Sequence, residues 1–228
     1  MKKRLYKLDE NYFEKIDTEE KAYWLGFIYA DGFITKRKQG QNILGITLHE
    51  IEPLEKFTKA ISTNKPIRSY ISNSKYKKNS VEYKTAIVSN KVVQDLESHG
   101  VVERKTFTLK FPKLPENLTS HFIRGYFDGD GSVFECKSYR KTLVHLGITI
   151  CGTESFLKDL RDSIPFLKGV SCIFKDTRKL TDCWSIKLKA NKRCLAMYTY
   201  MYQDCEENYL SRKKIKFEKF VNDKVQRL

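Results

Sequence analysis

Two aspartates stand in the same sequence setting, 99 positions apart, and their surroundings point to metal chemistry. Asp31 ends the apolar run "YWLGFIYAD", Asp130 ends "IRGYFDGD", and each is followed by a glycine that fits a left-handed helix cap. If each run is a helix, its dipole disfavours the terminal carboxylate by about 0.3 to 1 kcal/mol. Two such carboxylates brought together also repel one another, whereas a divalent cation between them makes the arrangement favourable. The pair therefore predicts a divalent-metal site.

Small residues are spaced so that the two helices can bring these aspartates together. Gly26 and Ala30 are four residues apart in the first run, as are Gly125 and Gly129 in the second, so each pair lies on one helix face. A glycine inside a helix costs about 1 kcal/mol relative to alanine, and close backbone approach is the usual compensation. Packing through these faces about a pseudo-twofold axis predicts that the two aspartates lie side by side.

The aspartates belong to a unit of about one hundred residues that occurs twice in the chain. The stretch "WLGFIYADG" aligns with "IRGYFDGDG", "GITLHEIEPLEKF" with "GITICGTESFLKDL", and "VSNKVVQDL" with "KANKRCLAMY". A lone helix ending in Asp-Gly is commonly an ordinary terminus, but duplication in register favours a shared site. We therefore expect a first repeat at 1–105, a proline-containing linker at 106–119 and a second repeat at 120–228.

Periodicity assigns the same order of elements to both repeats. Asp17 is the predicted N-cap of the first helix, which runs to about Ala30. The first repeat then has strands at about 33–36 and 42–49, a helix at 53–62, strands at 66–72 and 81–89, and a helix at 91–98. The second repeat has a helix ending near 129, strands near 132–135 and 143–151, a helix from 153, strands near 169–175 and 183–189, and a helix from 191.

The composition favours a nucleic-acid partner. The 228 residues carry 43 Lys and Arg against 28 Asp and Glu, a formal charge of +15, together with 13 Tyr and 14 Phe. No apolar run approaches the roughly 20 residues that span a membrane, and none opens the chain as a signal peptide, so we expect a soluble, intracellular protein with no membrane partner. Six cysteines without a CxxC pair argue against structural zinc.

The two aspartate motifs resemble the signature helices of the LAGLIDADG homing endonucleases in their single-chain, two-repeat form. The stretches "DTEEKAYWLGFIYADG", "HFIRGYFDGDGSV" and "NYLSRKKIKFEKF" extend the likeness over nearly the whole chain. The resemblance implies an α+β fold of two pseudo-twofold-related αββαββα units, in which two curved antiparallel sheets form a DNA-binding saddle. It also implies a monomer that makes a metal-dependent double-strand break at a long, asymmetric DNA site.

The resemblance also assigns roles to single residues. Asp31 and Asp130 become metal ligands, aided by the main-chain carbonyls of Ala30 and Gly129, with Mg²⁺ or Mn²⁺ as the cation and no organic cofactor. A lysine near the end of the last strand of a repeat is expected beside the scissile phosphate. Lys189 fits that place best and Lys187 is the alternative.

The first repeat departs from this pattern at two positions. Its counterpart of Lys189 is Val88, so the two strands of the target are expected to be cut at different rates. Tyr29 stands where Asp128 keeps the first acid of the motif, an acid that is normally structural. Both metal-binding positions are therefore retained, although the symmetry between the repeats is weakened.

Basic and polar side chains in the expected sheets and loops are candidates for DNA contact. Arginine reads guanine and glutamine reads adenine, while lysine mostly meets phosphate. The candidates are Lys36, Arg37, Lys38, Gln41, Arg68, Tyr70, Lys75, Lys77, Lys137, Arg140, Lys141, Lys175, Arg178 and Lys187. Each cluster taken alone is as well explained by a solvated loop, so the set as a whole carries the prediction.

Two other functions are compatible with the same scaffold. An RNA maturase that assists intron splicing would take intron RNA as its partner, and a regulator would bind DNA without cutting it. The retained pair Asp31 and Asp130 favours the endonuclease, because a pure binding protein has no need of two acids at helix ends.

Overall fold

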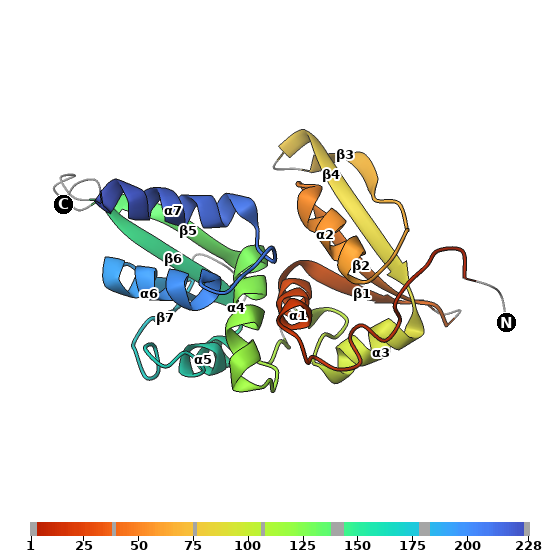
Figure 1. Cartoon of the computed structure of the whole chain (residues 1–228), viewed down its shortest axis with the longest axis horizontal. Coiled ribbons are helices and arrows are strands. Elements are labelled where there is room, and N and C mark those ends of the chain that lie inside the picture. The colour runs from red at the N-terminus through yellow and green to blue at the C-terminus, as the bar shows by residue number, and fades with distance from the viewer. Residues whose placement is uncertain are drawn as a thin grey trace.

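The computed structural model describes residues 4–37, 40–74, 77–105, 108–137, 144–177 and 183–225, which form two units of similar design (Figure 1). The first unit contains α1 (Glu19–Asp31), β1 (Gly32–Lys36), β2 (Asn42–Leu48), α2 (Glu52–Ala60), β3 (Arg68–Ser74), β4 (Lys77–Val88) and α3 (Asn90–Ser98). The second contains α4 (Glu116–Asp130), β5 (Gly131–Lys137), β6 (Val144–Gly152), α5 (Glu154–Asp162), β7 (Ile173–Lys175), β8 (Trp184–Leu188), α6 (Asn191–Tyr202) and α7 (Ser211–Val225). No helix within these ranges is long and apolar enough to cross a membrane.

Each unit has one antiparallel sheet of four strands, and the two sheets share a topology. Their strand orders are β1-β2-β4-β3 and β5-β6-β8-β7. In both, the strand that follows the aspartate-bearing helix lies at an edge, with Gly32 opposite Ile46 and Gly131 opposite Ile150. The α+β fold of two αββαββα units is therefore confirmed, and α7 follows the second unit.

One strand is shorter than the sequence indicates. The expected strand at 169–175 begins only at Ile173, because Gly169 has a φ of 71° and belongs to a turn. The pattern of apolar residues before Ile173 reflects packing of that turn rather than a strand.

One face of each sheet packs against helices and the other face is open. On β2 and β6, Leu44 and Ile148 are fully buried, whereas Tyr70 on β3 and Phe134 on β5 are exposed. This alternation is what an antiparallel sheet with one covered face requires. Each unit therefore has one open sheet face.

The helix α1 is apolar on every side because it is enclosed on every side. All residues from Tyr23 to Tyr29 are buried, and Figure 1 shows α1 beside α4 at the centre of the molecule, with one sheet on each side. The predicted N-cap is wrong by one residue: the Thr18 hydroxyl accepts the Lys21 N–H at 3.2 Å. Asp17 instead forms an ion pair with the Lys21 ammonium at 2.7 Å, since Thr18 has the extended backbone that a cap needs.

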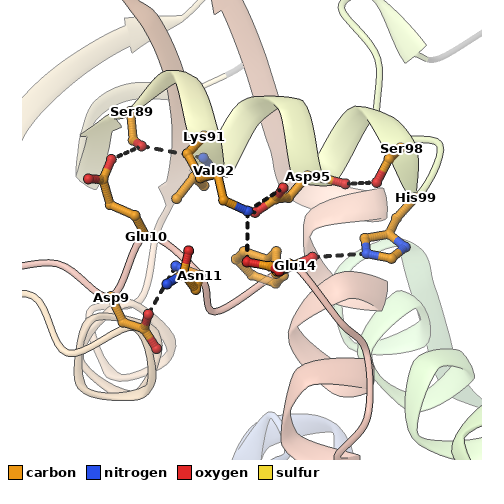
Figure 2. A network of polar contacts seen from close by, with 11 residues as sticks. Asp9, Glu10, Asn11, Glu14, Ser89, Lys91, Val92, Asp95, Ser98 and His99 are labelled. Atoms are coloured by element: carbon orange, nitrogen blue, oxygen red, sulfur yellow. Dashed lines mark hydrogen bonds and ion pairs between the residues drawn. The ribbon is translucent and has the colours of Figure 1, made fainter.

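Polar contacts fasten the segment before α1 along α3 (Figure 2). The Lys91 ammonium lies between the carboxylates of Glu14, at 3.0 Å, and Asp95, at 2.9 Å. At the other end of α3, the Nε2 atom of His99 lies 2.9 Å from the carbonyl oxygen of Phe13. The end of α3 is thus held from outside by the N-terminal segment.

Each unit also sends a segment across to the other. The Leu109 carbonyl, after the first unit, accepts the hydroxyl of Thr153, the N-cap of α5, at 3.0 Å. Conversely, the Ser211 hydroxyl at the start of α7 donates to Glu52 at the start of α2 at 2.9 Å. The two units are therefore linked by reciprocal extensions as well as by the central helices.

Candidate active site

The helices α1 and α4 meet backbone to backbone at two glycines. A Cβ added to Gly26 would lie 2.0 Å from the carbonyl oxygen of Phe122, and one added to Gly125 would lie 1.9 Å from that of Tyr23. Neither position has room for a methyl group. The small faces identified in the sequence are the faces through which the helices pack.

This contact brings the two aspartates to the same end of the helix pair. Asp31 is the last residue of α1 and Asp130 the last residue of α4. A Cβ added to Gly129 would lie 2.2 Å from that of Ala30 and 3.1 Å from the Asp31 Oδ2 atom. The carboxylate of one helix therefore reaches the last turn of the other.

The glycines that follow the aspartates do not have the left-handed backbone expected from the sequence. Gly32 has a φ of −74° and Gly131 a φ of −87°, both with extended ψ, because each helix runs directly into an edge strand. The glycines are needed for space instead: a Cβ added to Gly131 would lie 2.1 Å from a ring atom of Phe127. Each aspartate consequently lies where a helix runs directly into an edge strand.

The surroundings of Asp31 disfavour its charge. Burial raises the pKa of Asp31 to about 6, and the neighbouring Asp130 carboxylate adds to the rise. Lys213, Lys105 and Arg212, in that order, act in the opposite direction. Two repelling carboxylates surrounded by basic groups form a site suited to a cation and to a phosphate at once.

Two lysines occupy the carbonyl ends of the central helices. The Lys105 ammonium donates to the carbonyls of Ala30, at 3.3 Å, and Gly32. The buried Lys213 ammonium donates to three successive carbonyls at the end of α4, two at 2.6 Å and that of Gly129 at 3.1 Å. Burial lowers the pKa of both lysines, that of Lys213 to about 8. A positive charge therefore offsets the negative dipole at each helix end.

Sequence reasoning missed these two lysines, although a signal was present. Both are the second residue of an Arg-Lys pair, at 104–105 and 212–213. In each unit this pair follows the helix that comes after the last strand of the sheet, α3 in the first unit and α6 in the second. The first pair precedes the linker and the second begins a helix, so their alignment is hidden by different local structure. Their shared position becomes visible only in the folded molecule.

The two lysines that the resemblance assigns to this site lie at the end of β8. Lys187 is on β8, on the open face of its sheet, with its ammonium 5.8 Å from the centre of the Phe174 ring. Lys189 is exposed just beyond β8. The basic groups that act on the charge of Asp31 come from Lys213, Lys105 and Arg212, so a role for Lys189 stays a prediction from resemblance.

The candidate DNA contacts of the first unit are divided between two environments. Arg68 and Tyr70 lie on the open face of the sheet, where Arg68 is opposite Lys84. Lys84 was not among the candidates, and its ammonium lies 5.2 Å from the centre of the exposed Phe33 ring. Lys36 forms an ion pair with a glutamate of α3 at 2.7 Å and is turned toward the helices.

The remaining candidates lie at strand ends or beyond the described residues. Arg37 and Gln41 are exposed next to β1 and β2, Lys77 begins β4, Lys137 ends β5, and Lys175 ends β7 with its ammonium 5.7 Å from the Trp184 ring centre. Lys38, Lys75, Arg140, Lys141 and Arg178 lie outside the described residues.

The donors at the helix ends fit a hard divalent cation. The carboxylates of Asp31 and Asp130 are oxygen donors, and Mg²⁺ is commonly held by one or two carboxylates together with water and substrate phosphate. The described residues hold no cluster of three or more His, Cys, Asp or Glu side chains of the kind that encloses a metal by protein ligands alone. The carbonyls of Ala30 and Gly129, which the resemblance assigns to the metal, accept the lysine ammonium groups.

Comparison with known proteins gives matches at the level of structure. No family model matches the chain, and no curated protein sequence matches it. The chain is similar to the LAGLIDADG homing endonuclease I-LtrWI bound to target DNA, with a TM-score of 0.59 and 13% identity over 95% of this chain and 91% of that one. It is also similar to the homing endonuclease I-WcaI bound to its DNA recognition sequence, with a TM-score of 0.60 and 14% identity over 91% and 90% of the two chains.

A third similar structure is I-SmaMI bound to uncleaved DNA target in the presence of calcium ions. Its TM-score is 0.51 at 16% identity, over 80% of this chain and 83% of that one. The chain therefore has the two-unit fold of the LAGLIDADG homing endonucleases.

Proposed function

We propose that the protein is a LAGLIDADG homing endonuclease, a divalent-metal-dependent hydrolase that makes a double-strand break at a specific DNA site. The strongest support for the proposal is the position of Asp31 and Asp130. They end two helices that are in direct backbone contact, where their negative charges repel one another. A protein that only bound nucleic acid would gain nothing from this costly arrangement. A hydrolase gains a cation site at the centre of its DNA-binding surface.

Asp31 and Asp130 would hold the cation, Mg²⁺ or Mn²⁺, through their carboxylate oxygens. When bound, such a cation activates water and stabilises the leaving oxygen of a phosphodiester. Lys105 and Lys213 hold positive charge beside the aspartates, one at each helix end, where it attracts a phosphate and stabilises its added negative charge. No covalent nucleophile is required from the chain.

The open faces of the two sheets would bind double-stranded DNA. The two faces differ at the first residue pair after each aspartate-bearing helix joins its sheet. Phe33 is opposite Gly45 in the first unit, and Ser132 is opposite Thr149 in the second. Because the two faces present different groups to the grooves, the preferred target is asymmetric. Since one chain supplies both helix ends, the active species is a monomer.

Selection of cleaved sites from a randomised duplex library with Mg²⁺ tests the proposal. The wild-type protein is expected to enrich one long site, and the Asp31→Asn and Asp130→Asn variants are expected to bind that site without cutting it. The matched control is Asp162→Asn, which changes an exposed carboxylate on α5, paired with Arg161, and is expected to cleave normally. If the wild-type protein enriches no cleaved DNA and binds intron RNA tightly, an RNA maturase is the correct function.

A further inference from the structure

The motif position that departs from the expected pattern makes a specific contact in the first unit. Tyr29 is buried on α1, and its hydroxyl donates to the carbonyl oxygen of His99, the residue at the end of α3. Its ring packs edge-on against Phe122 of α4 at 5.0 Å between centroids.

The residue that receives this hydrogen bond lies in a tightly constrained turn. Gly100 follows with a φ of 96°, and a Cβ added there would lie 2.3 Å from the Tyr29 hydroxyl oxygen. Val101 is fully buried and its N–H donates to the Leu96 carbonyl at 2.9 Å. These contacts fix the conformation of the backbone where the chain leaves α3.

From this turn the chain leads to the active-site lysine of the first unit. Lys105 is six residues after His99, and its ammonium reaches the carbonyl end of α1. The same turn is held from the outer side, where the Nε2 atom of the His99 ring lies 2.9 Å from the Phe13 carbonyl oxygen. Figure 2 shows His99 beside the N-terminal segment that carries Glu14. Tyr29 holds the turn from the inner side, two residues before Asp31.

The second unit has an equivalent tether with the opposite hydrogen-bond polarity. Asp128 stands two residues before Asp130, and its buried carboxylate accepts the Leu210 N–H at 2.7 Å. The Tyr202 hydroxyl donates to the same carboxylate at 2.7 Å. Leu210 is three residues before Lys213, so this tether also fixes the backbone that carries the lysine.

We infer that Tyr29 is a positioning residue for Lys105, and that it performs with a donor hydroxyl the task that Asp128 performs for Lys213 with an acceptor carboxylate. The inference rests on the proposed nuclease function for its kinetic consequence and on the tether geometry alone for its structural one. An acid at position 29 would present an acceptor toward a carbonyl, which is also an acceptor. A tyrosine places a hydrogen-bond donor at the same motif position, and this donor pairs with the His99 carbonyl in the turn of the first unit.

Strand-resolved nicking kinetics of Tyr29→Phe test the inference. The substitution keeps the buried ring and removes only the hydroxyl. Groups that orient an active-site residue typically contribute about 10- to 100-fold to activity, so we expect a slowing of that size in one strand, with unchanged affinity for DNA. The matched control is Tyr198→Phe, which removes the half-buried hydroxyl that donates to Glu218 at 3.3 Å and should leave both rates unchanged.

A double-mutant comparison identifies the residue through which Tyr29 acts. Lys105→Met should slow the same strand as Tyr29→Phe, and the combined variant should be no more than about twofold slower than Lys105→Met alone. Equal slowing of both strands, or multiplied effects in the combined variant, would overturn the inference.

Hydrogen exchange tests the tether without any cleavage. The amide hydrogens of Gly100 and Val101 bond to the carbonyls of Glu97 and Leu96, and we expect them to exchange at least about tenfold faster in Tyr29→Phe than in the wild type or Tyr198→Phe. Unchanged exchange would overturn the inference even if the protein proves to be a nuclease. Faster exchange in a protein that cuts no DNA would uphold the tether and refute the proposed function separately.

Discussion

Replacing Gly125 by alanine gives the sharpest test of the central helix contact. The added Cβ would lie 1.9 Å from the carbonyl oxygen of Tyr23, about 1.4 Å inside the roughly 3.3 Å at which C–H···O contacts begin. Backbone on both sides of the contact leaves no flexible side chain to move, so the helices must separate by about that distance. Overpacking of this kind costs about 1 to 3 kcal/mol, and a displacement near 1 Å reduces catalysis by about a hundredfold.

The sign of the stability change makes the result decisive. In a helix without this contact, Gly→Ala stabilises by about 1 kcal/mol, so a loose interface predicts a higher unfolding free energy for Gly125→Ala and the present structure predicts a lower one. Urea unfolding of both proteins measures the difference, and nicking assays at saturating DNA measure the rate. Gly40→Ala is the control, because a Cβ there meets nothing within 4 Å and reports only the cost of a φ of 76°. A stabilised Gly125→Ala variant with normal cleavage would refute the backbone contact.

Three further predictions concern charge. In EDTA, Asp31→Asn should be more stable than the wild type by up to about 3 kcal/mol at pH 7, and the gap should close as the pH falls from about 6 to 4, because burial raises the folded-state pKa of Asp31 above its ordinary value. Urea titrations across that range measure it, and a gap independent of pH would contradict it. Lys213→Met leaves three helix-end carbonyls without their donor and should lower the unfolding free energy by about 1 to 3 kcal/mol, whereas Lys214→Met on the same helix should change it little. DNA affinity should fall by about 10³ to 10⁵ between 50 and 200 mM salt, as six to ten phosphate contacts require, and a weaker salt dependence in equilibrium binding would exclude that many contacts.

The fold was predictable because the repeat and the local periodicity agree with the tertiary structure. Sheets with one covered face alternate in sequence, and the apolar α1 is apolar on all sides because it lies between two units. The aspartates were predictable for a different reason. A carboxylate at the C-terminal end of a helix is disfavoured by the helix dipole, so a positive charge is expected nearby. The pairs Gly26 with Ala30 and Gly125 with Gly129 predicted the helix contact that brings the aspartates together.

The compensating charges could not be found from local patterns. Lys105 follows a turn and Lys213 opens a helix, so only the folded chain places both at the ends of α1 and α4. The left-handed caps expected at Gly32 and Gly131 failed because a helix that continues straight into a strand also selects glycine, for space rather than for backbone freedom. Each lysine bonds a helix end that is more than 70 residues away in the chain, and such a contact leaves no periodic signal around the lysine.

The contacts that each unit makes with the other through the reciprocal extensions determine what happens when the two halves of the chain are expressed separately. The segment after Lys105 attaches to Thr153 of the second unit, and the segment before Lys213 attaches to Glu52 of the first. Each half of the molecule thus supplies the outer anchor for the lysine arm of the other. Two halves expressed as separate chains would each lack one anchor and would regain both only on association, so recovery of the proposed nuclease activity would report on their reassembly.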